Sequence, residues 1–103
     1  MGGLIQVTSM EPVYDKYGHV MAVITKVKNA GDKIMRCSLT AHVVQVPKRG
    51  RIRKSEEHGS SETFELELAP GDERELEMVI HPAITAGREF TISVSVSVEE
   101  STA

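Results

Sequence analysis

Residues 90–98 read Phe-Thr-Ile-Ser-Val-Ser-Val-Ser-Val, alternating strictly between an apolar side chain and a hydroxyl side chain. Successive side chains of a β-strand point to opposite faces, so this pattern puts every apolar residue on one face and every hydroxyl on the other. An α-helix has about 3.6 residues per turn and cannot separate the two kinds in this way. The segment therefore predicts a strand with one face turned toward a core.

The same alternation recurs upstream. One face of a further predicted strand carries Met35, Cys37, Leu39, Ala41 and Val43. The predicted strands before the last one span residues 4–9, 20–28, 35–46, 64–68 and 76–80. The first of these is the weakest and is expected to end at Glu11-Pro12, and a seventh strand is a candidate near residues 50–54. Short strands separated by turns, without a helical period, predict an antiparallel sandwich or a small barrel.

A turn is expected at Ala69-Pro70-Gly71-Asp72, between two alternating segments. Proline presets φ for the first central position of a turn, and glycine accepts a positive φ at the second, as a type II turn requires. We therefore predict that residues 63–80 form an antiparallel hairpin with a slightly long loop. A second cluster of turn residues, 29–32, ends the strand at 20–28.

Composition indicates one globular domain spanning residues 1–103. The chain is 40% hydrophobic and 26% charged, with a formal net charge of −3, which is typical of a foldable sequence and not of a disordered one. With two Tyr, two Phe and no Trp, its core must be aliphatic, and one cysteine excludes an internal disulfide. No apolar run approaches the roughly 20 residues that span a bilayer, and no signal-peptide core follows the N-terminal residues. The chain is expected to be cytosolic or a piece of a larger protein, and the compartment stays open.

The residue types that carry chemistry are present but scattered. The four histidines are His19, His42, His58 and His81, and none has the spacing of metal ligands. Cys37 lies in register with apolar residues, which indicates a small core residue and not a nucleophile. Alternation puts Glu65, Glu67 and Glu77 on solvent-facing positions, where a catalytic carboxylate pair would lack a cleft. We therefore predict no catalytic, cofactor-binding or metal site.

The most concentrated charge lies in the predicted loop of residues 47–61, which we expect to be mobile. Its five cations are Lys48, Arg49, Arg51, Arg53 and Lys54. They predict a contact with a protein or another anionic surface, since loops on a rigid scaffold often bind partners. The alternative is a solvated excursion neutralised by Glu56 and Glu57. Nucleic acid is not expected, because no aromatic residues stand between the cations and the chain is net acidic.

Three segments resemble a known family. Residues 23–31 (VITKVKNAG), 37–41 (CSLTA) and 63–71 (TFELELAPG) are similar to the C-terminal β-sandwich domains of transglutaminases, most of all the first of the two. They are also similar to cell-adhesion-related sandwiches of the CARDB type. The resemblance implies an immunoglobulin-like antiparallel β-sandwich of about seven strands. In transglutaminases the catalytic residues belong to a separate core domain, and the Gly-Gln-Cys-Trp motif of that core is absent here.

Two function classes follow from these observations. The first is a non-catalytic accessory module that mediates protein–protein or interdomain contacts, as in adhesion or scaffold proteins. The alternative is an excised C-terminal sandwich domain of a transglutaminase-like enzyme, which regulates or positions a separate catalytic core. In both, the chain itself is not an enzyme, needs no cofactor, and binds another protein or an adjacent domain of the same chain. Fold alone does not choose between them.

Overall fold

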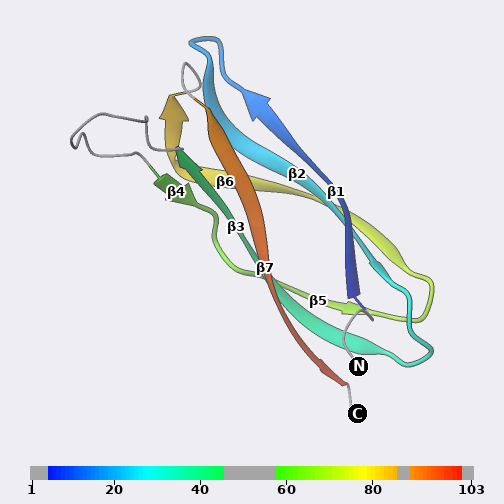
Figure 1. The fold of residues 1–103 in the computed structure, drawn as a ribbon. Coiled ribbons are helices and arrows are strands. Elements are labelled where there is room, and N and C mark those ends of the chain that lie inside the picture. The colour runs from blue at the N-terminus through cyan, green and yellow to red at the C-terminus, as the bar shows by residue number, and fades with distance from the viewer. Residues whose placement is uncertain (1–4, 46–57, 86–88, 101–103) are drawn as a thin grey trace.

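The computed structural model describes residues 5–45, 58–85 and 89–100, and this part of the chain forms strands and turns but no helix (Figure 1). Its seven strands are β1 (Ile5–Tyr14), β2 (His19–Asn29), β3 (Met35–Gln45), β4 (His58–Ser60), β5 (Phe64–Leu68), β6 (Glu73–Thr85) and β7 (Phe90–Glu100). Every pairing between neighbouring strands is antiparallel. The predicted all-β class with about seven antiparallel strands is confirmed.

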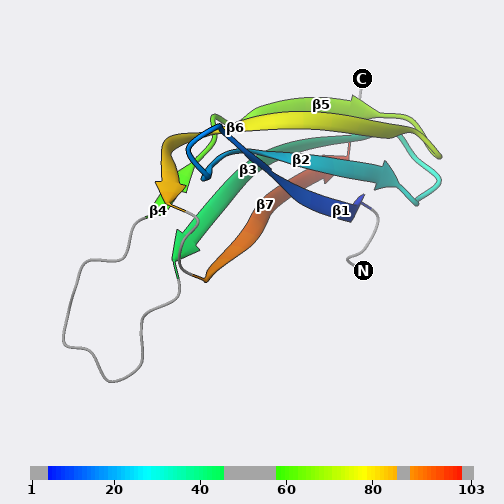
Figure 2. The ribbon, with the colours of Figure 1, turned by 90° about the horizontal axis from the view of Figure 1, so that it is seen from above.

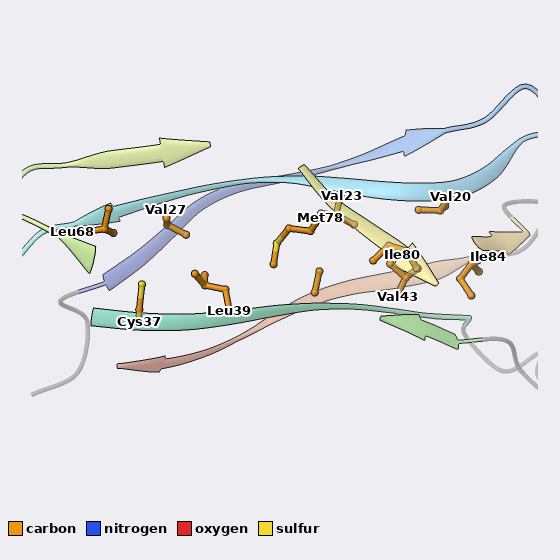
Figure 3. Packing of buried hydrophobic residues seen from close by; sticks show 11 residues of the cluster. Val20, Val23, Val27, Cys37, Leu39, Val43, Leu68, Met78, Ile80 and Ile84 are labelled. Atoms are coloured by element: carbon orange, nitrogen blue, oxygen red, sulfur yellow. The ribbon is translucent and has the colours of Figure 1, made fainter. Parts of the chain in front are cut away.

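The strands form two layers. One layer contains β1, β2 and β6 in that order. In the other layer β3 pairs along its length with β7, and its opposite edge pairs with β4 and then β5. Figure 3 shows the buried side chains of both layers pointing into the space between them. The two layers thus pack as a β-sandwich, as predicted.

The core is aliphatic, as the scarcity of aromatic residues requires. On β3 the five predicted core residues are all buried, while the residues between them are exposed or half-buried. The largest fully buried apolar side chains are Leu39, Leu68, Met78, Ile80, Ile84, Val20, Val23, Val27 and Val43. Burial of one such side chain stabilises the fold by about 1.5–3 kcal/mol, so the alternation on β2, β3 and β6 supplies the main driving force.

One side of the sandwich is closed by β4, which joins the two layers. Ser60 of β4 pairs with His81 of β6, while His58, Gly59 and Ser60 pair with β3. A side chain at Gly59 would collide with the carbonyl oxygen of Pro82 and would lie 2.7 Å from Cγ2 of Ile80. Only glycine therefore lets β4 approach β6 this closely. Strand β4 is thus the one strand that was not among the six predicted from alternation. The seventh strand that was predicted as a candidate near residues 50–54 falls outside the described residues.

The first strand is longer than predicted. It continues past Glu11-Pro12 to Tyr14, with irregular register between Val7 and Ser9 and again near Tyr14. Pro12 lies opposite Val23 of β2, and among the described residues β1 has no strand partner on its other edge. Proline is tolerated on such an edge because its missing N–H is not needed for a second ladder. The predicted end of this strand was therefore wrong.

The predicted hairpin of residues 63–80 was also wrong, although its turn is present. The amide of Asp72 donates to the carbonyl of Ala69 at 3.0 Å, and Gly71 has φ of 84°, as expected for a type II turn. However, β5 pairs with β3 and β6 pairs with β2. The turn therefore carries the chain from one layer to the other. Alternation and turn chemistry specify local geometry, but they do not determine which strands pair.

Replacing Gly71 by valine is expected to lower the free energy of unfolding by about 1–3 kcal/mol, because a β-branched residue is strained at positive φ. A Cβ atom at this position meets nothing within 4 Å, so the loss should come from backbone strain alone. Denaturant titration measures it, with Gly71→Asn as the matched control, since asparagine tolerates positive φ better. Equal stabilities of the two variants would contradict this assignment.

Candidate binding surface

The five predicted contact residues, Lys48, Arg49, Arg51, Arg53 and Lys54, lie outside the described residues. The last part of the predicted loop is described, and it is ordered structure. Residues 58–60 form β4, and the Ser61 hydroxyl accepts a hydrogen bond from the Ala41 amide at 2.9 Å. The Ser61 amide returns a bond to the Ala41 carbonyl at 2.9 Å. The loop was predicted to extend to residue 61, but residues 58–60 pair with β3 and Ser61 is hydrogen-bonded to Ala41 of β3. The predicted C-terminal boundary of the loop was therefore wrong.

The histidines do not form a common site. His42 and His81 lie on the strands flanking β4, each opposite Ser60. Within the part of the chain that the structure describes, no group of three or more His, Cys, Asp or Glu side chains could hold a metal ion. His19 lies beside Asp15, with 3.4 Å between Nδ1 and Oδ2. This pair belongs to a turn and not to a cleft.

Asp15 holds the turn between β1 and β2. Its Oδ1 accepts hydrogen bonds from the backbone amides of Tyr17 and His19, each at 2.8 Å. The bond from the His19 amide is the main reason that the pKa of Asp15 is lowered, because hydrogen bonding to the charged form favours ionisation. This carboxylate therefore organises local backbone and is not suited to act as a general acid near neutral pH.

Cys37 is buried, as predicted, with a relative exposure of 1%. It lies between Leu66 of β5 and Val98 of β7. Burial raises the pKa of its thiol, which lowers the population of the reactive thiolate. The environment of Cys37 is therefore that of a core residue.

The outer face of the β1–β2–β6 layer carries two pairs of opposite charges and two further carboxylates. Lys26 lies opposite Glu75, and Lys28 lies opposite Glu73. A shallow depression is lined by Lys26, Glu73, Arg74 and Glu75. The two Lys–Glu pairs compensate each other locally, whereas Glu11 and Glu77 both lie opposite Ile24 and not opposite a cation.

The sandwich is open on the side away from β4. There the two layers end in β1 and β7, which approach each other (Figure 2). Met10 and Tyr14 lie opposite the buried Thr25 and Val20 of β2 and so face inward, yet they are 40% and 50% exposed. On β7 the inward-facing residues are Ile92, Val94, Val96 and Val98, of which Val98 is 41% exposed and the others are half-buried. We call these residues of β1 and β7 the open side.

The open side was not predicted from the sequence. The alternation of residues 90–98 indicated which side chains face inward, but not that the opposite layer ends short of them. One available signal was the absence of any charged residue from 91 to 98. A strand buried on both edges and an unprotected edge strand can both show this composition, so the signal alone does not distinguish them.

Comparison with known proteins finds no matching family model, no similar curated protein and no similar solved structure. The resemblance to transglutaminase and CARDB-type sandwiches thus stays a prediction. The described part of the chain also contains no helix long and apolar enough to cross a membrane.

Proposed function

We propose that this chain is a non-catalytic β-sandwich module that mediates contacts with another protein or with an adjacent domain. The observation that carries this proposal is the open side, where inward-facing apolar residues of β1 and β7 are left partly exposed. Apolar surface gathered at one edge of a sandwich favours contact with a partner, whereas single exposed apolar residues need no such explanation. The buried core, against which Ile92, Val94 and Val96 pack, would hold this surface in a fixed shape.

The basic segment adds an electrostatic contribution in this proposal. Its five cations are at residues 48–54, outside the described residues. Exposed ion pairs contribute only about 0–1 kcal/mol each and are screened at physiological salt. The cations would therefore guide and strengthen a contact, with the main stabilisation coming from apolar burial.

A second candidate is a sandwich domain of a transglutaminase-like enzyme that positions a separate catalytic core. One observation favours it. The three segments that resemble this family meet in space: Cys37 and Leu39 pair with β5, and the Asn29 side chain donates to the carbonyl of Leu68 at 2.8 Å. The contact between the three segments supports an architecture shared with the transglutaminase sandwich domains. A catalytic core as the binding partner would favour this candidate over a general binding module.

A matched pair of photo-cross-linking positions tests the proposal. Val98 on the open side and Val79 on the outer face of β6 are both valines, with exposures of 41% and 43%. A photoreactive phenylalanine analogue at position 98 is expected to cross-link a partner protein in cells that produce the chain, and the same analogue at position 79 is not. Equal cross-linking from both positions, or none from position 98, would contradict the proposal.

The contribution of the five cations is tested by measuring binding to the partner protein that the cross-linking experiment identifies. Replacing all five by serine is expected to weaken binding at low salt and to have a smaller effect at physiological salt, because salt screens their contribution. Titration calorimetry at the two salt concentrations measures the difference. Equal affinity of both proteins at low salt would remove the basic segment from the contact.

A further inference from the structure

The free strand edges of this sandwich are not equally protected. An unpaired edge can add a strand from another chain, and proteins commonly block this with proline, charge, bulges or short length. The β1 edge contains Pro12 and two register irregularities. The β5 edge is only five residues long and includes Glu65 and Glu67. Both edges therefore carry features that disfavour pairing with another strand.

From residue 90 to residue 98, the β7 edge has none of these features, and the charges of this strand lie only at its C-terminal end. This strand is eleven residues long and pairs with β3 in one unbroken register, from Phe90 opposite Gln45 to Glu100 opposite Met35. Residues 91–98 contain no charge, proline or glycine. In the part of the chain that the structure describes, β3 is the only strand that pairs with β7. A long, regular and uncharged edge of this kind is prone to strand addition.

Exposure on the inner face of β7 also indicates room for another strand. Ala41 and Leu39 of β3 are fully buried, whereas their neighbours on β7, Val94 and Val96, are only half-buried. The opposite layer thus covers β3 completely but covers β7 in part. A strand added beside β7 would cover these side chains from the edge and extend the layer beneath β1.

The sequence of β7 identifies a strand that fits this edge. Residues 93–97 read Ser-Val-Ser-Val-Ser, which is the same in both directions, and Ile92 and Val98 extend the symmetry with two β-branched side chains. A two-fold contact requires a surface that complements itself. Antiparallel pairing of two such strands about Ser95 would place Val94 opposite Val96 and Ile92 opposite Val98.

We propose that two copies of this chain pair through β7, in antiparallel orientation about a two-fold axis at Ser95, to form one continuous sheet across the dimer. Charge disfavours the neighbouring register centred on Val94. That register would put Glu89 opposite Glu99, whereas the register centred on Ser95 puts Glu99 opposite Thr91. Like charges directly opposite each other are destabilising. The inference goes beyond the proposed function and does not depend on it.

Self-association of the purified chain tests the proposal. Sedimentation analysis over a range of concentrations is expected to show conversion from one chain to two, with no larger species. Ser95→Lys and Ser95→Glu are each expected to weaken this association roughly tenfold or more, because two like charges would meet at the axis. Ser95 is exposed on the outer face, so each single chain should keep its fold, which circular dichroism checks.

Mixing the two variants distinguishes two-fold pairing from other contacts. A mixture of Ser95→Lys with Ser95→Glu is expected to form a heterodimer, since opposite charges then meet at the axis. Gln6→Lys, which adds the same charge to the exposed face of β1, should associate like the unmodified chain. A chain that stays monomeric at every concentration, unchanged association of Ser95→Lys, or no association in the mixture would each overturn the proposal. A partner found by cross-linking without self-association would support the proposed function while overturning this inference.

Discussion

Replacing Asn29 by alanine is expected to lower the free energy of unfolding by roughly 3–5 kcal/mol, because each buried hydrogen-bonding group left without a partner costs about 1–3 kcal/mol. The Asn29 side chain is fully buried at the end of β2. Its Nδ2 donates to the carbonyls of Lys33 and Leu68, each at 2.8 Å, and its Oδ1 accepts from the Gly31 amide at 2.9 Å. Alanine would remove all three bonds at once.

The position of Asn29 explains the size of this effect. The side chain ties the loop after β2 to the end of β5, which lies in the opposite layer. Its backbone bonds to the turn before β6, through the Asp72 carbonyl and the Gly71 amide, remain possible in the variant. The difference in unfolding free energy between the unmodified chain and Asn29→Ala therefore measures the contribution of the side chain alone. A domain of this size is stable by about 5–15 kcal/mol, so the loss would be a large share of the total.

Asp72→Ala is the matched control for this measurement. It removes one hydrogen bond from the neighbouring turn, in which the Ala69 amide donates to Oδ2 of Asp72 at 3.0 Å. The Asp72 side chain is 41% exposed, so water can replace the lost partner, and we expect a loss of about 0.5–1.5 kcal/mol. Denaturant titrations of both variants give the comparison. A loss for Asn29→Ala no larger than that of the control would contradict the assigned role.

The strand faces were predictable from the sequence because alternation is a local property. The five apolar residues of β3 are buried as expected, and those of β7 face inward as expected. The pairing of β5 and β6 was not predictable, since the Pro70-Gly71 turn has the same local chemistry in a hairpin and in a connection between layers. Strand β4 has three residues, His-Gly-Ser, with no apolar alternation, and its position depends on the close approach of Gly59 to β6.

The candidate surface was less predictable than the fold. The sequence drew attention to the cations at residues 48–54, whose contact with a partner stays a prediction. The open side depends on where the opposite layer ends, and no property of residues 90–98 alone records this. Asn29 shows the same limit. The sequence marks it as a turn residue, but its bond to Leu68 joins positions 39 residues apart.

Replacing Cys37 by aspartate is expected to lower the free energy of unfolding by about 3–5 kcal/mol near neutral pH, because it buries a charge without a partner. Position 37 is 1% exposed and is flanked by Leu66 on β5 and Val98 on β7. Cys37→Ala leaves a small void but no charge and serves as the control, with an expected loss of about 1 kcal/mol. Denaturant titration compares the two variants.

The pH dependence of this variant gives a sharper test than its stability at one pH. Burial would raise the pKa of the introduced carboxyl in the folded state above its value of about 3.9 in the unfolded chain. A group with a raised folded-state pKa destabilises the fold as pH rises through the interval between the two values, and the penalty is smallest below the unfolded pKa. The difference in unfolding free energy between Cys37→Asp and Cys37→Ala should therefore shrink as pH falls toward 4.

In the unmodified chain, burial and the raised pKa of the Cys37 thiol should also make its modification slower in the native state than in denaturant. A difference that is independent of pH, or a native thiol that reacts as fast as an unfolded one, would mean that position 37 faces solvent and that the register of β3 is displaced by one residue.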